Sequence, residues 1–281
     1  MASLTSLPHE LILQIAHCEL LNERSLFSLI QANRHFYSIL WEALYKRARH
    51  HPIGLIRCII KGALTAVSKF IEIRVNVNAK VDLDSCHELD DSLAFSSFPF
   101  TYPLLAAVIR GDGDIVDQLL SQGAVVEARI EREIFWATHP DCPWDGASMH
   151  TALSVALMLG HDDIAVRLVE AMEDLNAVVC TRCGKDYTAL GHAALCLRPR
   201  VVRQLLLRGA NPDYQDPKDR TTVLHVLLAD AGLPLYINRL DNGEGLLMDV
   251  VMLLLEQGAD PLPQAAVSGA RGSQRGRRVQ S

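Results

Sequence analysis

Apolar residues recur along the chain in pairs of short segments, each with the three-to-four-residue spacing of an amphipathic helix. The first segment of a pair is seen in TALSVALMLG from Thr151 and in TALGHAALCL from Thr188. The second is seen in DIVDQLLSQGA from Asp114 and in DVVMLLLEQGAD from Asp249. The pattern therefore predicts a repeated unit of two short helices joined by a tight turn.

The spacing inside these units is constant. A core-facing position of the second helix follows the opening residue by 13 positions in the units that begin at Ile53, Tyr102, Thr151 and Thr188. The closing position comes 8 residues later, and a fifth unit that begins at Thr222 keeps this second interval. Its first interval is 28 residues, which predicts an insertion between its two helices.

These intervals set the predicted organisation of the chain. Residues 1–49 do not follow the spacing and form a separate helical segment, whereas residues 50–261 form the repeat domain. Residues 262–281 contain four arginines and no acidic residue, so we expect a disordered basic tail. The repeats are predicted near 53–78, 102–126, 151–176, 188–213 and 222–261, with insertions at 79–100, 127–148 and 231–247.

Residue types at the predicted helix ends agree with this arrangement. A threonine at the start of a unit caps the first helix through its hydroxyl, and Pro103 suits a first helical turn, where its missing N–H would be unpaired anyway. Glycines stand at both predicted turns because a left-handed backbone is easiest for glycine. They are Gly111 and Gly160 between the helices and Gly123, Gly209 and Gly258 after them.

The helix pairs resemble ankyrin repeats, in which Thr-Pro-Leu-His opens the first helix and Gly-Ala closes the second. Thr222, Leu224 and His225 keep most of the opening signature. Two units depart from the family pattern: Leu197 replaces the central glycine of the fourth, and the third lacks the Gly-Ala end. The resemblance covers about residues 50–261 and implies an all-α solenoid of helix pairs that binds another protein.

The insertions after the first two units are expected to project as long loops beside the binding face. Both carry aromatic residues, and the first is also rich in acids. Aromatic side chains on loops over a rigid scaffold are candidate anchors for a target protein, although they are equally suited to hold the loops against the repeats. The candidate target-binding residues are Asp90, Asp91, Phe95, Phe98, Trp136 and Trp144.

Residues 1–49 show a different pattern, that of three short helices. The first follows Pro8 and carries an apolar stripe of Leu7, Leu11, Ile12 and Ile15. The second carries leucines from position 26, and the third begins near Phe36. A segment this small rarely forms a sufficient core alone, so part of its apolar surface should be covered by a partner or by the first repeat.

This segment resembles an F-box, on the pattern Leu-Pro-x-Glu-Leu at 7–11, a leucine-rich middle and the Phe36-Tyr37 pair. Followed by ankyrin-like repeats, it is similar to the F-box proteins with ankyrin repeats of filamentous fungi. The resemblance implies docking to the Skp-type adaptor of a cullin-RING ubiquitin ligase, with the repeats holding a target. The adaptor contacts that it implies are Leu7, Pro8, Leu11, Ile15, Leu26 and Leu29.

Two features keep a second interpretation open. Trp41 follows Tyr37 by only four residues, which is closer than the usual F-box pattern. Terminal repeats also need covering, so the alternative interpretation is that residues 1–49 are a helical cap on the first repeat, without a ligase role. One stripe of the segment could also meet the adaptor while another meets the repeat.

The other motifs of the sequence do not predict a catalytic or metal-binding site. Cys180 and Cys183 have a Cys-x-x-Cys spacing, but no second pair exists, and we expect loop thiols without a metal or cofactor. The stretch RGDGD from Arg110 to Asp114 lacks the lysine of a phosphate-binding loop and the spacing of an EF-hand, and it reads as a turn. The sequence thus predicts a non-enzymatic protein without a small-molecule substrate.

Composition narrows the partners and the compartment. The formal charge of -6 and pI near 6.0 argue against sequence-independent binding to nucleic acid. The N-terminus lacks a basic region followed by an apolar run, and no apolar stretch reaches the length of a membrane span. Seven scattered cysteines fit free thiols in a reducing compartment. We therefore expect a protein of the cytoplasm or nucleus.

Overall fold

The computed structural model describes residues 7–17, 25, 28–29, 34–48, 53–82, 100–132, 148–182, 185–215, 221–229 and 242–261. The chain divides into two compact units, residues 1–125 and 126–281, and each is described by itself. Within the described ranges, no helix combines the length and the apolar character that a bilayer span requires.

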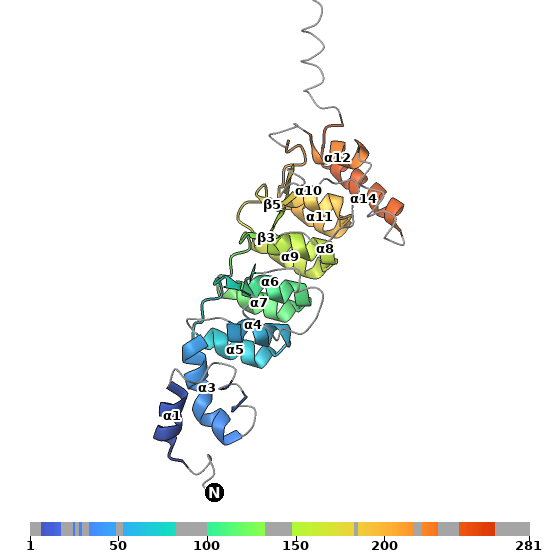
Figure 1. Ribbon diagram of the computed structural model, residues 1–281. Coiled ribbons are helices and arrows are strands. Elements are labelled where there is room, and N and C mark those ends of the chain that lie inside the picture. The colour runs from blue at the N-terminus through green and yellow to red at the C-terminus, as the bar shows by residue number, and fades with distance from the viewer. Residues whose placement is uncertain are drawn as a thin grey trace, which may run out of the picture. The chain divides into compact units, whose positions relative to one another are not determined.

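The first unit begins with helices outside the repeat pattern, α1 and α3 among them, and continues with two helix pairs (Figure 1). The first helices of the two pairs, α4 and α6, pack against each other, and so do the second helices, α5 and α7. Two short antiparallel strands, β1 and β2, lie at the root of the first long insertion. The elements are α1 (His9–His17), α3 (Arg34–Ala48), α4 (Ile53–Ile60), α5 (Leu64–Glu72), β1 (Val81–Asp82), β2 (Phe100–Thr101), α6 (Pro103–Arg110) and α7 (Gly113–Ser121).

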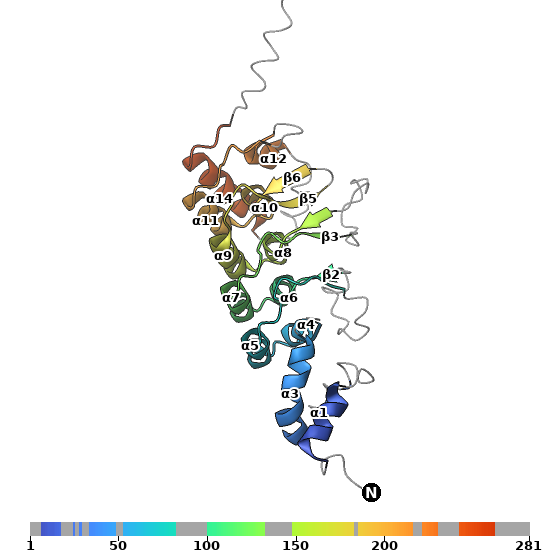
Figure 2. The same cartoon turned by 90° about the vertical axis from the view of Figure 1, so that its left-hand side faces the viewer.

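The second unit continues the helix pairs and adds a four-stranded antiparallel sheet in the order β3-β4-β5-β6. Figure 2 shows α9 and α11 along one side of this unit, with α8 and α10 between them and the strands. The strands are β3 (Ile130–Arg132), β4 (Ser148–His150), β5 (Val178–Arg182) and β6 (Lys185–Thr188). The helices are α8 (Ala152–Leu159), α9 (Asp162–Ala171), α10 (Ala189–Leu195), α11 (Pro199–Leu207), α12 (Val223–Ala229) and α14 (Gly243–Glu256).

The first helices α6, α8 and α10 are buried on nearly every side, whereas the second helix of each pair buries a single stripe. In α6, every residue from Pro103 to Ile109 is buried, while α7 buries only Ile115, Val116 and Leu119. Fully buried alanines such as Ala156 and Ala193 let the first helices lie close together. The predicted all-α repeat fold is confirmed, and short strands are added to it where the repeats join.

The predicted helix ends are also confirmed. The hydroxyl of Thr151 accepts a hydrogen bond from the Ser154 N–H at 3.4 Å, and that of Thr188 accepts one from Gly191 at 3.3 Å. Pro103 is the first residue of α6. Gly123, with φ of 77°, Gly209 and Gly258 all adopt the left-handed backbone at which the second helices end.

The left-handed turns recur at fixed positions even where the residue is not glycine. Nine residues after the unit opening, Gly62, Gly111 and Gly160 have φ between 66° and 78°, and Leu197 has φ of 53°. Leu197 is fully buried, so its packing offsets the backbone cost. At the second turn of the first repeat, Arg74 has φ of 59° and its side chain is exposed. Arg74 therefore carries the backbone cost without burial to offset it.

We predict that Arg74→Gly stabilises the protein by about 0.5–1 kcal/mol, because glycine adopts the left-handed region without steric strain. Urea denaturation followed by circular dichroism measures this as a higher midpoint. Arg203→Gly is the matched control, since Arg203 is equally exposed but lies inside α11, where glycine should destabilise by about 1 kcal/mol. A lower midpoint for Arg74→Gly would contradict the prediction.

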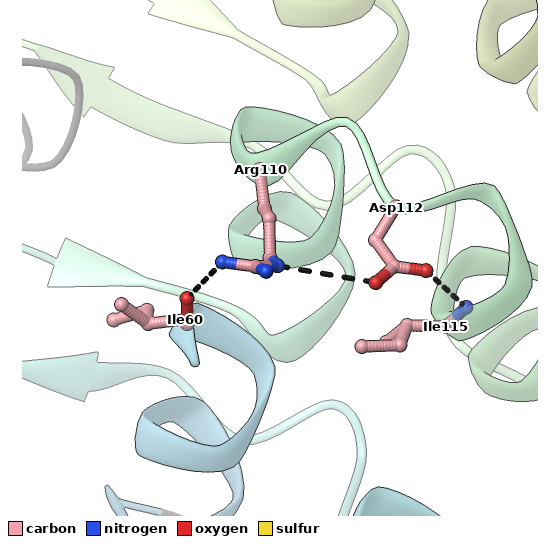
Figure 3. Close-up of polar contacts among 4 residues, drawn as sticks. All are labelled: Ile60, Arg110, Asp112 and Ile115. Atoms are coloured by element: carbon pink, nitrogen blue, oxygen red, sulfur yellow. Dashed lines mark hydrogen bonds and ion pairs between the residues drawn. The ribbon is translucent and has the colours of Figure 1, made fainter. Parts of the chain in front are cut away.

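Arginines of one repeat cover the helix ends of the repeat before it. The Arg110 guanidinium donates to the carbonyl of Ile60 at the end of α4 and pairs with Asp112 at 3.9 Å (Figure 3). Asp112 in turn caps α7 by accepting from the Ile115 N–H at 3.2 Å. The predicted RGDGD turn is thus confirmed, with Gly111 as its left-handed residue. The arginine satisfies a carbonyl that a helix C-terminus leaves unpaired.

The same contact recurs in the second unit. Arg198 Nε donates to the carbonyl of Leu157 near the end of α8 at 3.2 Å. Arg208 donates to the carbonyls of Val169 and Met172 at the end of α9. A Cβ atom at Gly160 would lie 2.9 Å from the Arg198 guanidinium, so the glycine also leaves room for the arginine.

A second polar contact joins successive repeats through the side chain 25 residues after the unit opening. Oδ1 of Asn78 accepts from the Val125 N–H at 2.8 Å, and Oδ1 of Asn176 accepts from the Asn211 N–H at 3.1 Å. Asp213 accepts from Asp260 in the same way. Glu127 holds this position in the second repeat, and its buried Oε1 has no hydrogen-bond partner among the described residues.

We predict that Glu127→Asn stabilises the protein by about 1 kcal/mol, because it removes an unpaired buried oxygen and supplies the amide used elsewhere. Thermal denaturation should show a higher Tm. The reverse change, Asn176→Glu, is the control and should lower the Tm, since it removes an amide that is hydrogen-bonded. The prediction fails if both variants move the Tm in the same direction.

One predicted boundary is wrong. The insertion of the fifth unit, placed at 231–247, ends earlier because α14 already begins at Gly243. Gly243 is buried, and it precedes the buried Val250 and Leu254 on the same helical face by 7 and 11 residues. Leu246 is half-buried on this face as well. The apolar stripe therefore extends the helix back to Gly243, into the stretch DNGEG, whose turn-like composition had favoured a loop.

Candidate protein-binding surfaces

The N-terminal helices form a small core of their own. Ile12 of α1 is buried with Phe36, Ile39 and Leu40 of α3. Leu7, Leu13 and Leu29 are partly buried against this cluster. The carbonyl of Pro8 accepts the N–H of Ile12 at 3.2 Å, so the proline lies directly before the helix rather than in its first turn. The predicted first and third helices of the segment are thus present.

The predicted apolar stripe of α1 is divided between two faces. Ile12 is buried against α3, whereas Leu11 and Ile15 are 43% and 42% exposed. Of the other candidate adaptor contacts, Pro8 is exposed, Leu7 and Leu29 are half-buried in the core, and Leu26 lies outside the described residues. An outward apolar surface therefore remains at Leu11 and Ile15 after the segment has formed its own core.

A separate face of the segment contacts the first repeat. The Lys69 ammonium of α5 lies 4.8 Å from the centroid of the Tyr37 ring and 5.8 Å from that of the Trp41 ring. It also donates to the Tyr37 hydroxyl. Such cation–π contacts contribute roughly 0.5–1 kcal/mol at exposed sites. The close spacing of Tyr37 and Trp41, unusual for an F-box, places both rings against one lysine.

The candidate target-binding residues in the long insertions lie outside the described residues. These are Asp90, Asp91, Phe95, Phe98, Trp136 and Trp144. The structure does show where both insertions start and end. The first is bracketed by β1 and β2 and the second by β3 and β4, so each leaves the repeats from an antiparallel strand pair.

From the sequence, Cys180 is expected in an exposed loop, and this expectation is wrong. It is a buried residue of β5, because β5 pairs with β4 and turns this side chain inward. Its Sγ lies 3.6 Å from Nδ1 of His150, which is also 3.0 Å from the Ser154 hydroxyl. Cys183 lies outside the described residues, which contain no group of three or more potential metal ligands.

Cys58 and Cys196 are also buried free thiols, and the Sγ of Cys196 lies 3.8 Å from Nε2 of His192. Burial raises the pKa of the Cys58 thiol to about 11, while the nearby Lys61 opposes the shift only in part. The Cys58 thiol therefore stays neutral at physiological pH, where a neutral thiol is a poor nucleophile. Cys58 is therefore a structural core residue of α4.

An open groove that no sequence motif indicates lies between α11 and α14, the second helices of the last two repeats. Its cavity measures about 480 Å³. Two arginines come from α11 and two acids from α14, with apolar side chains between them. The lining residues are Pro199, Arg200, Arg203, Asp249, Met252, Leu253 and Glu256. The sequence does contain a signal of this groove, because charged residues recur at helical spacing in the segments of α11 and α14.

Comparison with known families agrees with the repeat structure. Residues 104–216 match a family model described as ankyrin repeats in three copies. This range spans the second, third and fourth predicted repeats. The first and fifth lie outside the matched range, but the structure forms helices at their positions, α4 with α5 and α12 with α14. No curated protein sequence matches the chain.

Proposed function

We propose, from the ankyrin repeats of residues 104–216, that the chain is a non-enzymatic adaptor that holds a target protein for ubiquitylation. Ankyrin repeats are a protein–protein interaction module, and their presence accounts for the target-binding half of the proposal. In the other half, the N-terminal helices bind the Skp-type adaptor of a cullin-RING ligase. The F-box resemblance of residues 7–37 motivates that half.

The observation that carries the ligase half is the division of α1 into two apolar faces. Ile12 is used for the internal core, and Leu11 and Ile15 stay exposed one position before and three positions after it. Two exposed branched side chains four residues apart lie on one face of a helix. Because each is a little under half exposed, burying the remaining surface against a partner would contribute roughly 1 kcal/mol each.

A second candidate function is an ankyrin scaffold whose N-terminal helices only cap the first repeat. It is favoured by the contact of Tyr37 and Trp41 with Lys69, which fixes α3 against α5. This contact uses α3, however, and leaves the exposed face of α1 uncovered. Capping and adaptor docking therefore use different faces of the same segment.

We predict that Leu11→Asp combined with Ile15→Asp abolishes binding to a recombinant Skp-type adaptor, because each charge would be buried unpaired in the interface. The wild-type chain should bind in biolayer interferometry, and the double variant should bind at least about 100-fold more weakly. Leu228→Asp is the matched control, since Leu228 is 66% exposed on α12 and should leave binding unchanged. A wild-type chain that does not bind the adaptor eliminates the ligase half and leaves the scaffold.

We predict that Lys69→Ala lowers the stability of the chain and leaves adaptor binding unchanged. Loss of the cation–π contact should lower the Tm, because it removes about 0.5–1 kcal/mol from the junction of α3 with α5. Adaptor binding should be unchanged, because α1 still presents Leu11 and Ile15. Differential scanning fluorimetry and the same binding assay measure the two effects. A variant that loses adaptor binding at a wild-type Tm would place the docking face on α3 instead.

A further inference from the structure

Sulfur-containing side chains are divided between the core and the surface of the chain. The cysteines that the structure describes are buried free thiols, namely Cys58, Cys180 and Cys196. Met172, just after α9, is 3% exposed, and Met149 and Met158 are half-buried. On α14, in contrast, Met248 and Met252 are 62% and 47% exposed. The most exposed sulfur-containing side chains of the described residues therefore lie on this one helix.

The two methionines belong to an apolar stripe of α14. Met248, Met252 and Leu255 follow one another at spacings of four and three residues, so their side chains share one face of the helix. Leu255 is 40% exposed as well. The helix is the last element that the structure describes, and it packs against α11 and α12. These two neighbours leave the stripe in contact with solvent.

The thioether of methionine has a reactivity that the buried thiols lack. Its sulfur carries a lone pair without first losing a proton, so its oxidation depends mainly on access of the oxidant. A thiol must be deprotonated to react, and burial raises the pKa of the Cys58 thiol to about 11. An oxidant in solution therefore meets the thioethers of α14 before the core thiol of α4.

We propose that Met248 and Met252 are a modification site, at which hydrogen peroxide oxidises both thioethers to sulfoxides. In each reaction the sulfur lone pair attacks one peroxide oxygen, an S–O bond forms and the O–O bond breaks. The displaced hydroxide takes the proton of the new S–OH group and leaves as water. The sulfur loses two electrons and the peroxide gains them. The inference does not depend on the ligase role, because it concerns another part of the chain.

Oxidation changes the character of the stripe. A thioether is a soft apolar group, whereas a sulfoxide is polar and its oxygen accepts hydrogen bonds. Two of the three side chains of the stripe become polar, and only Leu255 keeps its apolar surface. Methionine sulfoxide reductases convert the sulfoxide back to the thioether. The polarity of this face of α14 is therefore set reversibly by peroxide.

The groove beside α14 accommodates the polar product. Met252 lines this groove together with Arg203 of α11. Arg203 is exposed and forms no ion pair with another residue that the structure describes. Its guanidinium carries several N–H donors, for which a sulfoxide oxygen is a suitable acceptor. Because both methionines are also exposed, their oxidation alters the surface of the helix without placing a polar group in the core.

Peptide mapping of the folded full chain after timed exposure to hydrogen peroxide tests the site. Met248 and Met252 should each gain one oxygen at least about 10-fold faster than Met172, because the reaction follows exposure of the sulfur. The half-buried Met149 and Met158 should fall between these rates. In the urea-unfolded chain all five should react at similar rates, so that the order is shown to depend on the fold.

Hydrophobic interaction chromatography of the folded chain tests the change of the stripe. Wild type should elute earlier after peroxide treatment, and methionine sulfoxide reductase should restore its retention. Met248→Leu combined with Met252→Leu should keep its retention under the same treatment. Leucine has a similar volume, so circular dichroism and the Tm of this variant should match wild type. Met158→Leu is the matched control and should lose retention as wild type does.

Two results would overturn the proposal. Oxidation of Met172 as fast as Met248 in the folded chain would show that the fold does not direct the peroxide to α14. Earlier elution of the double leucine variant after peroxide treatment would place the responsible site elsewhere in the chain.

Discussion

The helices of each repeat are too short to persist alone, so each pair depends on burial against the next. The pairs from α4 to α11 have helices of seven to ten residues, below the roughly 12–15 residues at which isolated helices become even marginal in water. Of their first helices, α6, α8 and α10 are buried almost all round, which is possible only between neighbours. The capping threonines begin helices, and the left-handed turns reverse the chain, so that each helix packs against its neighbours in the next repeat.

Much of this arrangement could be predicted because the packing imposes one spacing on the chain. The position 13 residues after the opening residue faces neighbouring helices in the first four units, so small or branched apolar residues recur there: Ala66, Ile115, Ile164 and Val201. The spacing also explains why Leu197 and Arg74 adopt backbone angles that their side chains disfavour. Glycine forms the left-handed turn at these positions in neighbouring units, and Leu197 and Arg74 adopt it at a cost.

Features set by contacts between distant residues could not be predicted in this way. Cys180 falls at the junction before the fourth repeat, where a hairpin loop is predicted, but pairing of β5 with β4 buries it beside His150. Tyr37 and Trp41 were recognisable as an aromatic pair, yet only the structure shows that both rings meet Lys69. The groove between α11 and α14 combines charges that lie more than forty residues apart. The division of α1 into a buried and an exposed face likewise depends on where α3 packs.

In the arginine and Asn/Asp contacts described above, the later repeat supplies the hydrogen-bond donor and the earlier repeat the acceptor. Arg110, Arg198 and Arg208 cover carbonyls of the preceding repeat, and Asn78, Asn176 and Asp213 accept N–H groups of the following one. A repeat that has just left the ribosome therefore has unpaired groups at its helix ends and at its junction until the next repeat emerges. During synthesis, each repeat therefore gains these hydrogen bonds only after the next repeat has been made. A stalled or truncated chain ends in a repeat that still lacks these contacts.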